Sequence, residues 1–94
     1  MVNVKIGSYG NYSSDNYGAH CQYVDVGDLT LYFSYKTVVA FQTPKTGLRI
    51  SKNDWGRTTG KHLNWVHPDK SIRLPREQFE NELAVVLKEH NLTV

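Results

Sequence analysis

The segment LTLYFSYKTVVAF (residues 29–41) decides the fold, because it carries the strongest strand signal in the chain. Large apolar residues at 29, 31, 33 and 35 alternate with threonine, tyrosine, serine and lysine, so one side of a strand faces a core. The stretch from Val38 to Phe41 continues in β-branched and aromatic residues. Thirteen residues is long for one strand. We therefore predict a tight turn near residues 35–37 and two antiparallel strands.

The flanking segments extend this pair into a meander. Residues 20–26 have the pattern of a strand, and Gly27-Asp28 after them is suited to a hairpin turn. On the other side, TPKTG (residues 43–47) combines a proline that fixes φ with a glycine that accepts positive φ. Residues 48–51 then form a short strand. The N-terminal half of the chain is thus expected to be an antiparallel sheet.

A helix is expected from about residue 75 to residue 90. Pro75 suits a first helical turn, and apolar residues at 79, 83, 86 and 87 follow the spacing of one buried stripe. We predict a single α+β domain over residues 1–94, with a meander of four to six short strands packed against this helix. The expected core consists of Leu29, Leu31, Phe33, Val39, Phe41, Phe79, Leu83 and Leu87.

Composition limits the class of protein. Apolar residues make up 39% of the chain and charged residues 21%, as in ordinary globular domains. No apolar run is long enough to cross a bilayer, and the N-terminus lacks the apolar region of a signal peptide. Cys21 is the only cysteine, which excludes an intrachain disulfide and favours a reducing cytosol and a buried thiol. We expect a cytoplasmic protein.

Charge is distributed unevenly along the chain. The net charge is +2, but residues 36–76 hold nine lysines and arginines against two aspartates, while residues 1–35 and 77–94 are both acidic. A basic face with an anionic partner is one interpretation. The alternative is that folding scatters these charges over the surface.

The segment GSYGNYSSDNYG (residues 7–18) is rich in tyrosine, serine, glycine and asparagine. Antibody loops use the same residues, because a rigid amphipathic ring on a polar backbone makes contacts at low entropic cost. Tyr9, Tyr12 and Tyr17 are therefore candidate partner-binding residues. The alternative is a turn between two edge strands with half-buried tyrosines.

The segment DWGRTTGKHLNW (residues 54–65) has the most unusual chemistry in the chain. It is not a nucleotide-binding loop, because three residues instead of four separate its glycines and histidine follows the lysine. A weak anion site remains open, built from Arg57, Thr58, Thr59 and Lys61. The other interpretation is a short helical turn over residues 58–63, capped by one of the two threonines, with the tryptophans anchoring the sheet to the helix.

No residue set has the spacing of a metal or catalytic site. His62 and His67 are too far apart in sequence for a compact zinc pair, and the glutamates are expected on the solvent side of the helix. We expect no cofactor, no metal and no enzymatic activity.

Two blocks, SYKTVVAF (residues 34–41) and TTGKHLNW (residues 58–65), resemble a family of small uncharacterised proteins of bacteriophages and mobile elements. The resemblance covers about residues 12–87. It implies a viral or mobile-element origin and expression in the bacterial cytosol. It implies no activity and no site residues.

Three functions are consistent with these observations. The first is an accessory protein that binds and inhibits a host protein or protein–nucleic-acid complex, such as a CRISPR effector or another defence component. The second is a nucleic-acid-binding module that uses the basic segment with Trp55 and Trp65 as stacking platforms. The third is a binder of a small anionic ligand. The expected partner-binding residues are Tyr9, Tyr12, Tyr17, Arg57, Lys61 and His62.

Overall fold

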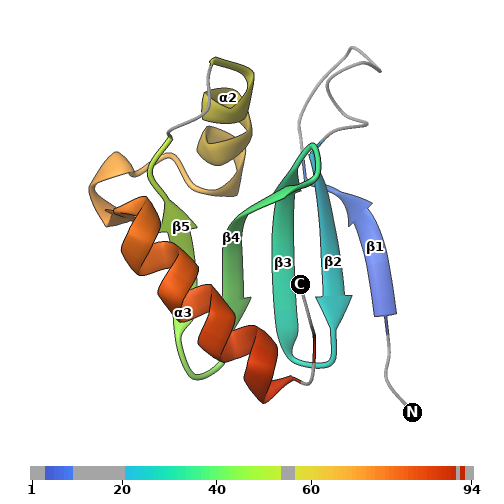
Figure 1. Ribbon diagram of the computed structural model, residues 1–94. Helices are drawn as coiled ribbons and strands as arrows, with labels where there is room; N and C mark the ends of the chain where they lie inside the picture. The colour runs from blue at the N-terminus through green and yellow to red at the C-terminus, as the bar shows by residue number, and fades with distance from the viewer. Residues whose placement is uncertain (1–3, 10–20, 54–56, 91, 93–94) are drawn as a thin grey trace.

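A six-stranded sheet with its strands in sequence order forms the centre of the molecule (Figure 1). The computed structural model describes residues 4–9, 21–53, 57–90 and 92, and the side chains of Arg57 and Thr58 fall outside the description. The strands are β1 (Val4–Ser8), β2 (Gln22–Val26), β3 (Leu29–Ser34), β4 (Thr37–Thr43), β5 (Gly47–Ser51) and β6 (Arg73–Leu74).

The first five strands pair antiparallel, which confirms the predicted meander. Tight turns join β2 to β3, β3 to β4 and β4 to β5 where the sequence indicated them, with Gly27 at φ 62°, Tyr35 at φ 56° and Gly47 at φ 69°. Only the short β6 runs parallel to its neighbour β5. A parallel neighbour requires a crossover, and here helix α2 (Arg57–Val66) and the 3₁₀ turn η1 (Lys70–Ile72) provide it.

Helix α3 (Arg76–Glu89) packs across one face of the sheet, over β4 and β5 and the end of β3 (Figure 1). It begins directly after Pro75, which confirms the predicted helix. The rings of Phe41 and Phe79 meet at the centre of this layer, with centroids 5.6 Å apart. The buried residues of the layer are Leu29, Leu31, Phe41, Phe79, Val86 and Leu87. Phe33 and Leu83, also expected in the core, are partly buried at its edge.

Helix α2 packs against the other face of the sheet. Its Leu63 is fully buried among Val39, Ala40 and Ile50. The helix is longer than the short turn that the sequence predicted, and Thr59 lies within it rather than at its cap. Gly60 weakens a helix in general, but a Cβ here would lie 2.9 Å from the Asn53 side-chain nitrogen, so glycine allows this close approach.

A β-bulge in β4 changes which residues of this strand face each helix. The register shifts where Tyr32 pairs with Ala40 and Phe33 pairs with Val38, so that Val39 is the extra residue on β4. Val38 and Phe41 consequently pack under α3, whereas Val39 and Ala40 pack under α2. The prediction that Val39 shares a core with Leu31 and Phe41 was wrong, because simple alternation does not anticipate an inserted residue.

No helix among the described residues is long and apolar enough to span a bilayer. Cys21 is fully buried, as expected for a small apolar thiol, and its sulfur lies 3.7 Å from the Ser8 hydroxyl.

The C-terminal end of α3 is held to the β2–β3 turn by His90. Its Nε2 lies 2.7 Å from Asp28 Oδ1, and its Nδ1 lies 2.8 Å from the Val86 carbonyl oxygen. A carbonyl accepts only, and so does a carboxylate. Both ring nitrogens therefore donate, which requires the imidazolium form. The Asp28 hydrogen bond is the main cause of a pKa for His90 above its ordinary value of 6.5, with a further contribution from Val86.

This arrangement predicts a pH-dependent stability. Because the pKa of His90 is raised by folding, its stabilising contribution is fully present below pH 6.5 and is lost as the pH rises through the folded-state value. We expect Asp28→Asn to destabilise the protein at pH 6 and to have little effect at high pH. Urea unfolding of both proteins across this range measures the difference. If the original protein and Asp28→Asn differed in unfolding free energy by the same amount at every pH, the ion pair between His90 and Asp28 would not be the cause.

Candidate binding surface

All four tyrosines of the described residues lie on the face of the sheet that carries α2. Tyr32 packs with the cluster around Leu63, and Tyr23 pairs with Tyr32 across the strands and therefore points the same way. Its ring lies over Gly7, where a Cβ would come within 2.7 Å of the Tyr23 side chain. We call this surface the tyrosine face, defined by Tyr9, Tyr23, Tyr32, Tyr35 and Trp65.

Tyr9 is fixed in place by both its backbone and its side chain. Its amide donates to the Cys21 carbonyl at 3.1 Å, which continues the pairing of β1 with β2. Its hydroxyl donates to the Phe33 carbonyl at 2.8 Å, and its ring meets that of Tyr32 edge-on at 5.4 Å. A half-buried ring held in this way loses little entropy when a partner covers it.

Beneath the tyrosine face, three polar side chains join α2 to β3. The Ser34 hydroxyl lies 2.7 Å from His62 Nδ1 and 2.9 Å from the Thr59 hydroxyl. All three residues are buried, and His62 is fully inaccessible. A serine bonded to a histidine resembles part of a catalytic pair, but no substrate can reach these atoms without opening the layer. The network is better suited to orienting α2 on the sheet.

Three aromatic rings lie close to His62. The centroids of Tyr35 and Trp65 lie 5.9 and 5.8 Å from that of His62, and the Tyr9 ring lies 6.4 Å away. Tyr35 is 49% exposed although it is a large ring. It also has φ 56°, a left-handed conformation that disfavours side chains other than those of glycine, asparagine and aspartate. The turn thus presents an aromatic ring to solvent at a cost in backbone strain.

The structure places the residues proposed from sequence at different depths. Tyr9 is half-buried in the tyrosine face, and Lys61 is exposed on α2. His62 lies under the surface, so it can support a contact but cannot make one directly. Three proposed contacts lie outside the described residues, namely Tyr12, Tyr17 and the side chain of Arg57.

The proposed anion site is not assembled as the sequence suggested. Thr59 is buried, and its hydroxyl bonds Ser34 rather than facing solvent. It is therefore unavailable to an anion beside Lys61. Trp55 and the side chain of Thr58 lie outside the described residues, and Trp65 is partly buried, with its ring centroid 5.8 Å from that of His62.

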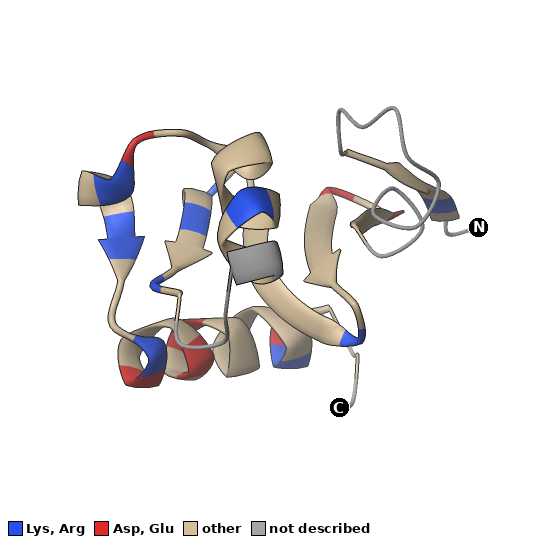
Figure 2. Ribbon diagram, turned by 90° about the horizontal axis from the view of Figure 1, so that it is seen from above, with Lys and Arg blue, Asp and Glu red and all other residues tan. Residues whose placement is uncertain are grey.

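Charge remains partly segregated after folding (Figure 2). All four glutamates of the chain lie on α3, together with Arg76 and Lys88, and Glu82 pairs with Arg49 of β5 at 3.3 Å. Further basic side chains lie after β5, on β6, on η1 and on α2. Backbone and side-chain bonds join these elements, since Lys52 donates its amide to the Leu74 carbonyl and Arg73 donates to Asn64 Oδ1 at 2.8 Å. We call this surface the basic edge, defined by Lys52, Lys61, Lys70 and Arg73. Of the described acidic residues, Asp69 lies beside it, where two hydrogen bonds from Ser71 lower its pKa.

Sequence reasoning missed the residues that organise this surface. Ser34 and Tyr32 lie on a strand whose other face was identified as the core, and alternation alone places them together on the opposite face. Tyr23 shares this face because it pairs with Tyr32. Thr59, His62, Leu63 and Val66 follow helical i, i+3, i+4, i+7 spacing. That stripe was not recognised because half of it is polar. Within the described residues, no group of three or more histidine, cysteine, aspartate or glutamate side chains could hold a metal ion.

Comparison with known proteins gives a family but no function. A family model described as a family of unknown function, DUF8033, matches residues 4–81, which is most of the chain. No curated protein and no solved structure matches the chain.

The buried polar network leads to a prediction about stability. Ser34→Ala removes the shared partner of His62 and Thr59, and leaving buried polar groups unsatisfied costs about 1–3 kcal/mol. Thr59→Ala should cost less, because Ser34 keeps its bond to His62. Chemical denaturation of both single variants and the double variant should give non-additive losses. Strictly additive losses would mean that the three side chains do not act together.

Proposed function

The chain belongs to the DUF8033 family of unknown function, and we propose that it is a non-enzymatic binding protein that contacts a macromolecule through the tyrosine face. The observation that carries this proposal is the gathering of Tyr9, Tyr23, Tyr32, Tyr35 and Trp65 on one side of the sheet, each partly or largely accessible. Tyrosine, tryptophan and arginine dominate binding energy at protein interfaces.

The conformation of Tyr35 supports this proposal independently of composition. Glycine or asparagine would occupy its left-handed turn position at lower cost. A half-exposed tyrosine therefore brings backbone strain at this position, where its ring centroid lies 5.9 Å from that of His62. Strained residues that persist in a fold point to a function for the side chain. Contact with a partner supplies a reason for this ring at this place.

The resemblance to bacteriophage and mobile-element proteins suggests the kind of partner. We infer that the protein acts in the host cytosol by occupying a host macromolecule. A component of host defence, such as a CRISPR effector, is the target class that best fits a small protein that binds without catalysis. The class of partner is inferred from the resemblance of the two sequence blocks and from the surface chemistry together.

A second candidate function is binding of single-stranded nucleic acid. It is favoured by the basic edge, whose Lys61 lies on the same helix as Trp65 of the tyrosine face. Basic side chains beside aromatic platforms are the elements that bind single strands without sequence preference. Binding of a small anion is less well supported, because Thr59 is committed to Ser34.

Replacement of Tyr35 by asparagine tests the first proposal. Asparagine tolerates the left-handed turn, so the melting temperature should stay within a few degrees of the original or rise. Loss of the exposed ring should abolish capture of the partner from a bacterial lysate, as quantified by mass spectrometry of proteins retained on the immobilised chain.

Lys45→Ala is the matched control, because Lys45 is exposed in the β4–β5 turn at the opposite end of β4. A partner retained by the original chain and by Lys45→Ala, but lost with Tyr35→Asn, is the expected result. Equal retention by all three proteins would exclude the tyrosine face as the contact surface.

Salt dependence tests the second candidate. If the four side chains of the basic edge each neutralise a phosphate, the affinity for a labelled single-stranded oligonucleotide should fall with a log–log salt slope of about −3. Lys61→Ala should make that slope less steep by about the contribution of one phosphate contact. Fluorescence anisotropy measures both quantities. Absence of binding at low salt would leave protein recognition as the function of this surface.

A further inference from the structure

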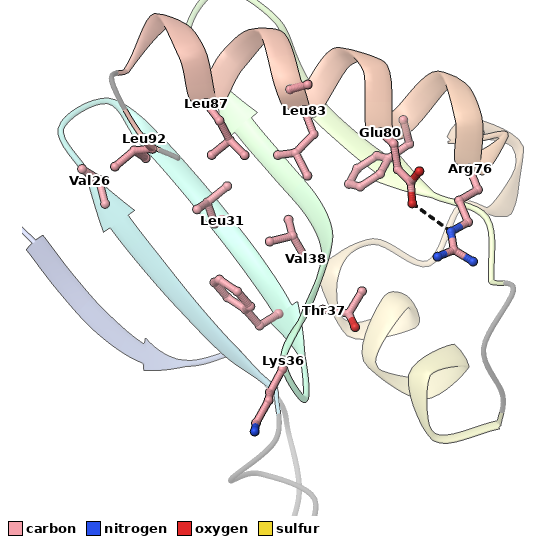
Figure 3. A pocket seen from close by; sticks show the side chains of 13 residues that line it. Val26, Leu31, Lys36, Thr37, Val38, Arg76, Glu80, Leu83, Leu87 and Leu92 are labelled. Carbon is pink, nitrogen blue, oxygen red and sulfur yellow. Dashed lines mark hydrogen bonds and ion pairs between the residues drawn. The ribbon is translucent and has the colours of Figure 1, made fainter. Parts of the chain in front are cut away.

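A groove runs along the side of α3 on the face of the sheet opposite the tyrosine face (Figure 3). Its volume is about 650 Å³. Leu31, Phe33 and Val38 form its floor, and Leu83, Leu87 and Leu92 form its wall. It does not depend on the tyrosine face, and none of the functions proposed above uses it.

The apolar floor continues past the groove onto the first two strands. Val24 and Val26 pair with Leu31 and Leu29, and Ile6 and Val4 pair with Val24 and Val26 in turn. Directly paired residues point to the same side of a sheet, so all of them lie on the α3 face. Val4 and Ile6 are 59% and 65% exposed. Aliphatic side chains with such high exposure on one face of a sheet indicate a surface that binds another protein segment.

The width of the uncovered face matches one helix. Strands are spaced about 4.8 Å apart and a helix is about 10 Å across, so one helix covers about two strands. Helix α3 occupies the part of the sheet over β4 and β5, and no described element covers β1 and β2 on this side (Figure 1). A second helix beside α3 would complete the layer.

Exposed positive charge at one end of the groove gives that helix a direction. Lys36 is exposed at the end where α3 begins, and Arg76, bonded to Glu80 at 2.9 Å, lies on the same end (Figure 3). The β2–β3 turn lies where α3 ends, and its Asp28 carboxylate is already paired with His90 at 2.7 Å. A helix carries partial negative charge at its C-terminus and partial positive charge at its N-terminus. An antiparallel neighbour of α3 would place its C-terminus, with its partial negative charge, beside Lys36.

We propose that this groove binds one amphipathic helix of a partner protein, antiparallel to α3, through an aliphatic stripe and an acidic last turn beside Lys36. The stripe lies over β2 and the exposed aliphatic residues of β1, beside the groove floor at Phe33. This is helix-in-groove recognition, in which anchors at i, i+3, i+4 and i+7 supply the affinity. The acid beside Lys36 fixes the orientation.

Two synthetic peptides of about 15 residues, long enough to form a helix when docked, serve as probes. Both carry the same leucine stripe, and the last turn contains two glutamates in one and two lysines in the other. Fluorescence anisotropy with the full chain should show tighter binding of the acidic peptide. Lys36→Glu should reverse this preference.

Adjacent positions on α3 provide a matched pair of variants. Ala84 is exposed and lines the groove, whereas Val85 is 56% exposed and faces away from it. Ala84→Glu should weaken the binding of the acidic peptide at least about tenfold, because it places a charge against the apolar stripe of the peptide. Val85→Glu should leave the affinity unchanged. Circular dichroism verifies that both variants keep the fold.

Equal effects of the two α3 variants, or no change of preference with Lys36→Glu, would overturn the proposal. Sedimentation of the chain alone tests the other possible occupant. A concentration-dependent dimer that is lost with Ala84→Glu and kept with Val85→Glu would replace the partner helix by a second copy of this chain. These experiments use no residue of the tyrosine face, so their failure leaves the proposed function intact.

Discussion

The inserted residue Val39 is the constraint on which both layers of this protein depend. Strict alternation along β4 would place Val38 with Ala40 on one face and Val39 with Phe41 on the other. The bulge instead sends Val38 and Phe41 to α3, and Val39 and Ala40 to α2. One short central strand thereby supplies two adjacent residues to a single face. In a chain of 94 residues, this allows two helices to be packed on one sheet.

The two helices are held by different physical forces. Under α3 the contacts are hydrophobic, centred on the rings of Phe41 and Phe79. Under α2 the hydrophobic contacts around Leu63 are joined by the bonds of Ser34 to Thr59 and His62. Apolar packing is not directional, whereas hydrogen bonds are. The polar network therefore fixes the orientation of α2, and with it the position of Trp65 and the support beneath Tyr35.

Neither helix extends over β1 and β2, so the first two strands expose both of their faces in part. On the α2 side they present Tyr23 of β2 and Tyr9 directly after β1, and on the α3 side they present valine and isoleucine. A tyrosine ring tolerates water at its edge, but an exposed aliphatic side chain gains mainly from burial. The two surfaces are thus suited to different contacts, and each can be tested without altering the other.

The sequence by itself determined the elements of the meander and helix α3, because strand alternation, turn residues and a helical apolar stripe are local signals. It also indicated the uneven charge, since all the glutamates belong to one helix. It did not determine the bulge at Val39, the full length of α2 or the burial of His62. These features depend on which residues of distant segments come together. Ser34 of β3 and Thr59 of α2 form their hydrogen bond only when α2 packs on the sheet. Tertiary structure likewise decided which side the tyrosines share, because face assignment follows strand register, and register is a relation between segments rather than a property of one.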